Sequence, residues 1–264
     1  MDLATLIGLL IGLGALIGGF LLEGGQGSML VVKTAAIIVF GGTFGAVIIS
    51  FTMDELRQLP TALKRIFVRE EIDYILILDQ IVDTADKARR GGLLSLENEL
   101  VHIENDFFTR GLQLVIDGTD PELTRTMLDM EIEAFEKNEM VGADIFMTAG
   151  GYAPTMGIIG TVMGMIHVLA SIAEPDKIAG AIAVAFLAIL YGVASANVLW
   201  LPFGTKLRIK AEKEIYLMDL IVEGILSIQA GENPRVIREK LSTFLPPDVR
   251  KNLLESGLPI DMEM

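Results

Sequence analysis

Four long stretches of the chain contain no Asp, Glu, Lys or Arg: Leu3–Leu22, Thr34–Met53, Ile145–Ala173 and Ile178–Thr205. A helix needs about 20 predominantly apolar residues to cross a bilayer, and a soluble domain of this size has little use for four such runs. The sequence therefore predicts an all-α membrane protein with four transmembrane helices in two hairpins and a helical cytoplasmic domain. Because the spans hold no acid, any ion transfer inside them must use hydroxyls, the backbone or an acid supplied by a partner.

The first stretch could also be a signal peptide. Only Asp2 stands between the initiating Met and the apolar run, so the basic segment that opens a signal peptide is missing, and no clear cleavage site follows. The run is also long enough to span. A retained helix is the favoured interpretation.

The charge and residue composition argue against several classes of function. The net charge is −14, and the charges lie between and after the spans. With no cysteine and two histidines, the chain has neither a disulfide framework nor a histidine-rich metal centre, so we expect no cofactor. No basic stripe balances the acidic excess, which argues against nucleic acid as a partner.

The distribution of Lys and Arg predicts the orientation. Residues 54–144 hold ten of them and the tail 206–264 holds nine, whereas the connections Gly24–Lys33 and Glu174–Lys177 hold one each. Under the positive-inside rule the long polar parts, and so both termini, are cytoplasmic. The predicted organisation has four parts: residues 1–53 with two spans, 54–144 as a cytoplasmic helical domain, 145–205 with two spans, and 206–264 as C-terminal cytoplasmic helices.

The polar parts carry helix signals. Apolar residues recur at near-helical spacing over Ile72–Val82 and again over Leu93–Val115. Pro121 follows Asp120 at a position typical of a helix start, and Gly231–Arg235 is predicted to be a turn before a last short helix. We expect a compact helical bundle.

The third span carries glycines on one helical face, at Gly157, Gly160 and Gly164. Close helix packing is the favoured reading of such small residues. In the same span Pro154 removes a backbone donor and frees a carbonyl, and Thr161 lies about two turns further on. The Thr161 hydroxyl could bind a cation or water, but bonding to its own helix backbone is the more common role of Thr in spans.

The fourth span has a similar ladder at Ala188, Gly192 and Ala196, and Pro202 closes it. In the polar domain, Lys87–Glu97 gathers basic residues and an acid around a Gly-Gly break. Such charges form a solvated face by default, or dock a partner of complementary charge.

Taken together, these segments resemble the MotA/PomA family of flagellar stator proteins over essentially the whole chain. The resemblance rests on the Ala-Arg-Arg-Gly-Gly-Leu-Leu-Ser-Leu-Glu segment, the Ala-Pro-Thr-Met-Gly-Ile-Ile-Gly-Thr-Val-Met-Gly segment of span three, and Ala183–Gly192 of span four. It also rests on the Gly-Glu-Asn-Pro-Arg segment of the tail. The glycine-rich span alone is less specific, since TolQ and ExbB proteins have a similar one.

The resemblance implies a homopentamer around a dimer of a MotB-type single-span protein whose membrane Asp relays the ion. It implies that the cytoplasmic part pushes the rotor protein FliG. It assigns Arg89 and Glu97, with Arg90 as the alternative basic residue, to the rotor contact. The positions expected along the ion pathway and its coupling to torque are Pro154, Thr161, Ala188, Tyr191 and Pro202.

One departure from the family's pattern predicts which ion is transported. Sodium-type members carry a Thr-Thr pair where this chain has Ala188 and Ile189. We therefore expect protons, with sodium as the alternative because Thr161 is retained.

Three other functions compete. A TolQ/ExbB-type energiser of envelope transport would have one span before the cytoplasmic segment, whereas two precede it here. A stand-alone transporter would show inverted-repeat halves and a midplane site. An enzyme is disfavoured because no nucleophile–base pair is visible.

Overall fold

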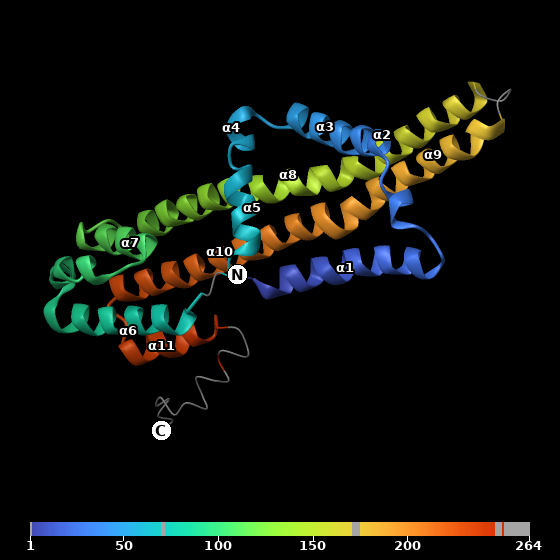
Figure 1. Ribbon diagram of the computed structural model, residues 1–264. Coiled ribbons are helices and arrows are strands. Elements are labelled where there is room, and N and C mark those ends of the chain that lie inside the picture. Colours follow the sequence, from blue (N-terminus) through green and yellow to red (C-terminus); the bar gives the residue numbers. More distant parts are fainter. Residues whose placement is uncertain (1, 70–71, 171–174, 246–249, 251–264) are drawn as a thin grey trace. The chain divides into compact units, whose positions relative to one another are not determined.

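The computed structural model describes residues 2–69, 72–170, 175–245 and 250, and throughout these residues it forms helices and loops without any strand (Figure 1). The shorter helices of the first half are α1 (Leu3–Leu22), η1 (Gly27–Leu30), α2 (Lys33–Ala36), η2 (Ile37–Gly41), α3 (Gly42–Ser50), α4 (Met53–Leu56), α5 (Leu59–Phe67), α6 (Tyr74–Gly91), η3 (Leu93–Asn98), η4 (Leu100–His102) and α7 (Asp106–Ile116). The second half is made of α8 (Pro121–Ala170), α9 (Pro175–Ser195), η5 (Ala196–Trp200), α10 (Leu201–Gln229) and α11 (Pro234–Ser242).

Four helical stretches are long and apolar enough to cross a membrane: Leu3–Leu22, Gly27–Ser50, Pro121–Ala170 and Ile178–Gln229. This confirms the predicted all-α membrane fold. Glu174, the first residue of the predicted connection Glu174–Lys177, lies outside the described part of the chain. The tail residues 246–249 and 251–264 lie outside it too.

Two of these stretches contain a π turn, η2 in the second span and η5 in the fourth. The second turn ends directly before the first turn of α10, which contains Pro202. Proline has no N–H, and its ring crowds the carbonyl four residues earlier, here that of Val198. A wider turn at this point relieves that crowding.

By packing, the chain divides into two compact units. Unit 1 comprises residues 1–70 and 138–210, and unit 2 comprises residues 71–137 and 211–264. The predicted boundaries at 144/145 and 205/206 fall inside α8 and α10, which continue without a break. Where the bilayer surfaces cut these two helices stays a prediction.

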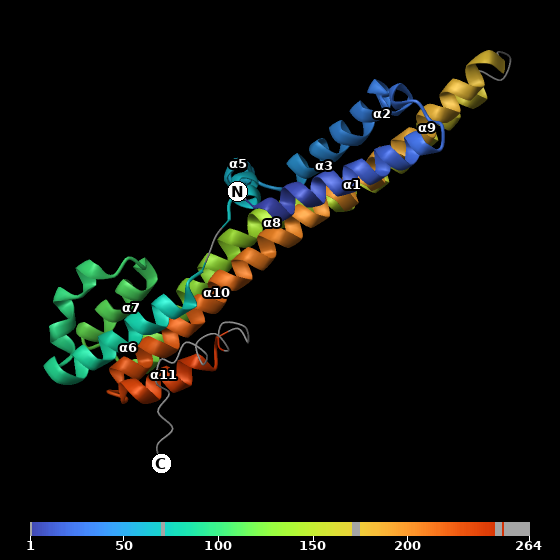
Figure 2. The ribbon, with the colours of Figure 1, turned by 60° about the horizontal axis from the view of Figure 1, so that its bottom comes forward.

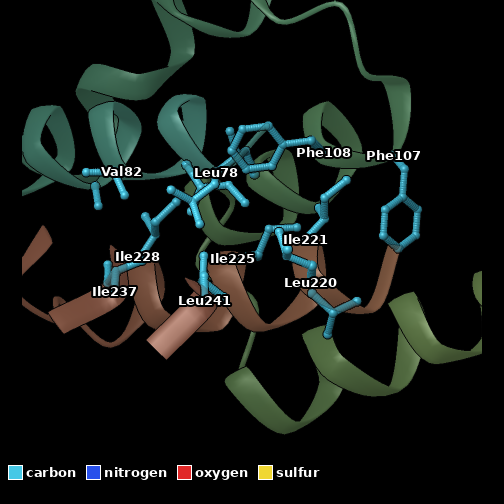
Figure 3. Close-up of a cluster of buried hydrophobic side chains, with 14 of the residues drawn as sticks. Leu78, Val82, Phe107, Phe108, Leu220, Ile221, Ile225, Ile228, Ile237 and Leu241 are labelled. Carbon is cyan, nitrogen blue, oxygen red and sulfur yellow. The ribbon is translucent and has the colours of Figure 1, made fainter. Parts of the chain in front are cut away.

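Unit 2 has a core of its own, drawn in Figure 3, in which α6, α7, α10 and α11 meet. Leu78, Phe108, Ile221, Ile225 and Ile237 are fully buried there. Side-chain caps fix the helix starts: the carboxylate of Asp73 accepts from the Leu76 N–H at 3.0 Å at the start of α6, and the amide oxygen of Asn233 accepts from the Arg235 N–H at 3.0 Å at the start of α11. The apolar pattern of Leu93–Val115 is carried by η3, η4 and α7 rather than by one helix.

In unit 1, one face of α5 packs against α8 and the first turns of α10. Their shared cluster consists of Ala62, Ile66, Ala143, Phe146, Phe203 and Leu207. The Lys210 ammonium donates to the carbonyls of Arg65 and Val68, both at 2.6 Å, so it holds the end of α5. Helix α1 contacts η5 and α5, and its N-terminal end lies near α5 in both Figure 1 and Figure 2. None of its residues is buried within this chain.

Candidate functional site

The glycines of α8 form a close seam with α9. A Cβ added at Gly157 would lie 2.8 Å from the carbonyl oxygen of Ala188, and one at Gly160 would lie 2.7 Å from the Ala188 Cβ. At Gly164 the corresponding distance to the Ala185 Cβ is 2.8 Å. Real side chains do not tolerate such approaches, so only glycine lets the two helices come this close. The packing interpretation of these glycines is confirmed.

Gly192 makes the reciprocal approach from α9 to α8 at Pro154. A Cβ there would lie 2.5 Å from the carbonyl oxygen of Ala153 and 3.1 Å from the Cα of Pro154. Pro154 stands inside the 50-residue helix α8, where its missing N–H leaves one carbonyl of the preceding turn without its helical donor. The structure thus places this weakened turn directly against the backbone of α9.

The Thr161 hydroxyl lies between two carbonyls. Its oxygen is 3.1 Å from the Gly157 carbonyl oxygen in its own helix and 2.8 Å from that of Ala185 in α9. A hydroxyl has a single hydrogen to donate, so the two carbonyls compete for it, and the oxygen lone pairs stay available to a further donor or cation. The expected bond to the helix's own backbone is present, and the bond to α9 is one that the sequence did not indicate.

Ala188 and Tyr191 contribute to the same seam in different ways. Ala188 is 1% exposed, so its methyl fills the seam and offers no polar atom. The Tyr191 hydroxyl donates to the carbonyl of Leu30 and accepts from the N–H of Val32 at 2.9 Å. Tyr191 therefore joins α9 to the end of η1 and the residues directly after it, near the start of the second apolar stretch.

Pro202 lies next to a cavity of about 370 Å³ formed by the first turns of α1 and by residues 197–206. At the edge of this cavity the Lys206 ammonium binds the Asp2 carboxylate and the Thr5 hydroxyl. The sequence did not predict this cavity. Gly8 and Gly12, one turn apart on the first span, were a signal that could have indicated it.

The charged residues proposed for a partner contact lie in unit 2, at the end of α6 and in η3. The Arg90 guanidinium is tied to Asp86, with Nη2 2.6 Å from Oδ2 and Nε 3.1 Å from Oδ1. Arg89 and Glu97 are exposed, and neither has an ion pair with another described residue. The structure thus distinguishes the paired Arg90 from Arg89, two adjacent arginines that the sequence could not tell apart.

Comparison with known proteins places these features in a family. The sequence model of the MotA/TolQ/ExbB proton channel family matches residues 99–220, and that of the motility protein A N-terminal region matches residues 6–92. Motility protein A of Bacillus subtilis is 36% identical over 258 residues, covering 97% of this chain and 96% of that protein. The chain belongs to the MotA family of motility proteins. Chemotaxis protein PomA of Vibrio alginolyticus is a further relative, 36% identical over 93% of this chain and 96% of its own length.

Solved MotA-family structures share the fold. The flagellar MotAB stator complex of Bacillus subtilis contains a chain that aligns with a TM-score of 0.86 at 36% identity, covering 94% of this chain and 98% of that one. MotAB of C. jejuni aligns with a TM-score of 0.87 at 29% identity, covering 94% and 97%. The predicted identity as a flagellar stator channel subunit, rather than a TolQ/ExbB-type energiser or an enzyme, is confirmed at the level of the family.

Proposed function

We propose that this chain is one subunit of a homopentameric stator ring in the cytoplasmic membrane, with both termini in the cytoplasm. A MotB-type single-span partner with a membrane Asp completes the ion path, and proton flow turns the ring against the rotor protein FliG. One observation carries this proposal: the four spans of a MotA-family chain contain no acid, so the ionisable relay of a proton path must come from another chain. Solved relatives that are complexes named MotAB support a partner of this kind.

The Thr161 hydroxyl is the proposed polar group of this chain on the ion path. Its hydrogen is engaged with a backbone carbonyl, so its oxygen can accept a hydrogen bond from a hydrated proton or from the protonated partner Asp. A dehydrated sodium ion needs several oxygen ligands, and the neighbouring positions Ala188 and Ile189 provide none from their side chains. This favours protons as the transported ion.

Arg89 and Glu97 are the proposed rotor contacts. An exposed charge without an intramolecular partner can pair with a rotor charge at little expense, whereas Arg90 would first have to release Asp86. Reversal of charge by Arg89→Glu should therefore reduce motor torque strongly, and Arg90→Glu, the matched control, should reduce it less. Torque of single tethered cells measures both. Equal loss in the two variants would contradict the assignment, as would failure of any compensating charge reversal on the rotor to restore Arg89→Glu.

Deletion of the gene tests the overall function. In a strain with no second stator gene, the cells should assemble flagella that do not rotate, and expression of the wild-type chain should restore swimming. Normal swimming of the deletion strain would refute the proposal.

A further inference from the structure

The cavity beside Pro202 has the dimensions of a ligand site. It lies wholly within unit 1, between α1 and the segment formed by η5 and the start of α10. Its volume of about 370 Å³ lies in the range of small-molecule sites, about 300–1,000 Å³. Along α1 it reaches from Ala4 to Gly12, which corresponds to about 12 Å of helix.

Two glycines of α1 shape this cavity, one at its closed end and one over its open space. A Cβ at Gly12 would lie 3.1 Å from Val198 Cγ1, so α1 and η5 touch there. One turn earlier, a Cβ at Gly8 would meet nothing within 4 Å, so the two segments have separated and left space over Gly8. The walls are mostly apolar, as in a bilayer, and Thr5, Asn197 and Lys206 supply the polar atoms.

The polar end of the cavity holds one cation, the Lys206 ammonium, which is paired with the Asp2 carboxylate. The Lys206 ammonium has three N–H donors, and the described residues engage two of them, through the Asp2 carboxylate and the Thr5 hydroxyl. Of the three basic residues Lys206, Arg208 and Lys210, only Lys206 lines the cavity; no acid occurs in the sequence from Thr205 to Ala211. Basic residues directly beyond a span attract the anionic headgroups of the cytoplasmic leaflet.

We propose that this cavity is a binding site for one anionic phospholipid of the surrounding bilayer. One acyl chain lies over Gly8 between α1 and η5, and the phosphate accepts a hydrogen bond from the free N–H of Lys206. A transmembrane partner helix, about 10–12 Å across and about 30 Å long, does not match a cavity that covers about 12 Å of α1. A single acyl chain fits the length and the apolar walls, and a phosphate oxygen can accept from the remaining N–H of Lys206.

A bound lipid would affect torque because Pro202, directly after the π turn η5, lines the cavity. A lipid there would fill the space between α1 and the π turn that precedes Pro202, and so hold α1 beside η5. This inference goes beyond the proposed stator function, and its test measures lipid retention without motility. Failure of one therefore leaves the other unaffected.

Lipid retention by the purified complex of this chain with its partner tests the site. The complex would be reconstituted in nanodiscs of phosphatidylglycerol and phosphatidylcholine in equal amounts, and native mass spectrometry would count the lipids that remain bound. Wild type should retain phosphatidylglycerol in preference. Gly8→Leu places a side chain in the cavity, with a Cβ that meets no protein atom within 4 Å, and should lose this lipid. Gly14→Leu, whose Cβ also meets nothing within 4 Å but which lies outside the cavity, should keep it.

The charge contribution is tested separately. Lys206→Gln should reduce the preference for phosphatidylglycerol about fivefold, the value of about one juxtamembrane cation, and Lys206→Arg should restore it. Since Lys206→Gln also breaks the ion pair with Asp2, Asp2→Asn serves as the control: it breaks the pair but keeps the cation, so retention should be equal or higher. Unchanged lipid retention in Gly8→Leu would overturn the proposal, as would equal retention of both lipids by wild type. A photo-crosslinker at Gly8 that captures protein instead of lipid would overturn it too.

Discussion

The close approach of Gly192 to Pro154 makes a strong prediction about one methyl group. In Gly192→Ala the new Cβ would start 2.5 Å from the Ala153 carbonyl oxygen, and because that atom is backbone it cannot rotate away. Helices α8 and α9 must then separate by about half an ångström or more in a tightly packed seam. Overpacking of this kind costs about 1–3 kcal/mol, against about 0.5–1 kcal/mol gained by replacing a helical glycine with alanine.

The net expectation for Gly192→Ala is a loss of about 1–2 kcal/mol of stability. Gly180→Ala is the matched control on the same helix, since a Cβ there meets nothing within 4 Å. It should be neutral or slightly stabilising. Thermal unfolding of the reconstituted complex would compare the two, and swimming speed would show whether the seam at Pro154 supports torque. If Gly192→Ala proved as stable as Gly180→Ala, the close backbone approach would be refuted.

Three further predictions follow from other contacts. Tyr191→Phe removes both hydrogen bonds to the Leu30–Val32 connection and should cost about 1–3 kcal/mol, with faster hydrogen exchange at the Val32 amide; unchanged exchange would show that the bonds are not made. The hydrogen bond from Lys240, and then that from Arg125, lower the pKa of Glu223 below its ordinary 4.5. The ionised Glu223 carboxylate therefore stabilises the fold above about pH 4.5, and this contribution is lost as the pH falls through the lowered pKa of the folded state. Glu223→Gln should thus reduce the stability of unit 2 at neutral pH and make it less dependent on pH in the acid range. A mutant whose stability depends on pH as the wild type's does would contradict this. Swimming speed at fixed proton-motive force should not depend on external sodium, and a steep dependence would exclude protons as the sole ion.

Much of the fold was accessible from the sequence because its strongest signals are local. Charge-free length alone predicts the four spans, and Asp120 before Pro121 and Asn233 before Pro234 mark helix starts that the structure contains. The resemblance to MotA proteins supplied the site residues, and their roles stay predictions.

The remaining features depend on which atoms come close together in three dimensions, and the spacing of residues in the sequence does not encode that. Nothing in the sequence states that the Thr161 hydroxyl meets the Ala185 carbonyl, or that Arg90 is held by Asp86 while Arg89 is not. The π turns were missed for a related reason. An apolar span has the same residue pattern whether its turns close with i→i+4 or with i→i+5 hydrogen bonds. Only the proline that follows η5 indicates the change.

The turn at η5 also bears on angular phase. A residue removed from a regular α-helix turns everything beyond it by about 100°. A π turn holds one residue more than an α turn, so it can give up a residue and leave the helix beyond it in phase. Beyond η5, Phe203 and Leu207 lie in the buried cluster with Ala62 and Ile66. Removing one residue from η5 should therefore keep both side chains in that cluster, whereas removing one from the regular part of α9 would turn them away from it.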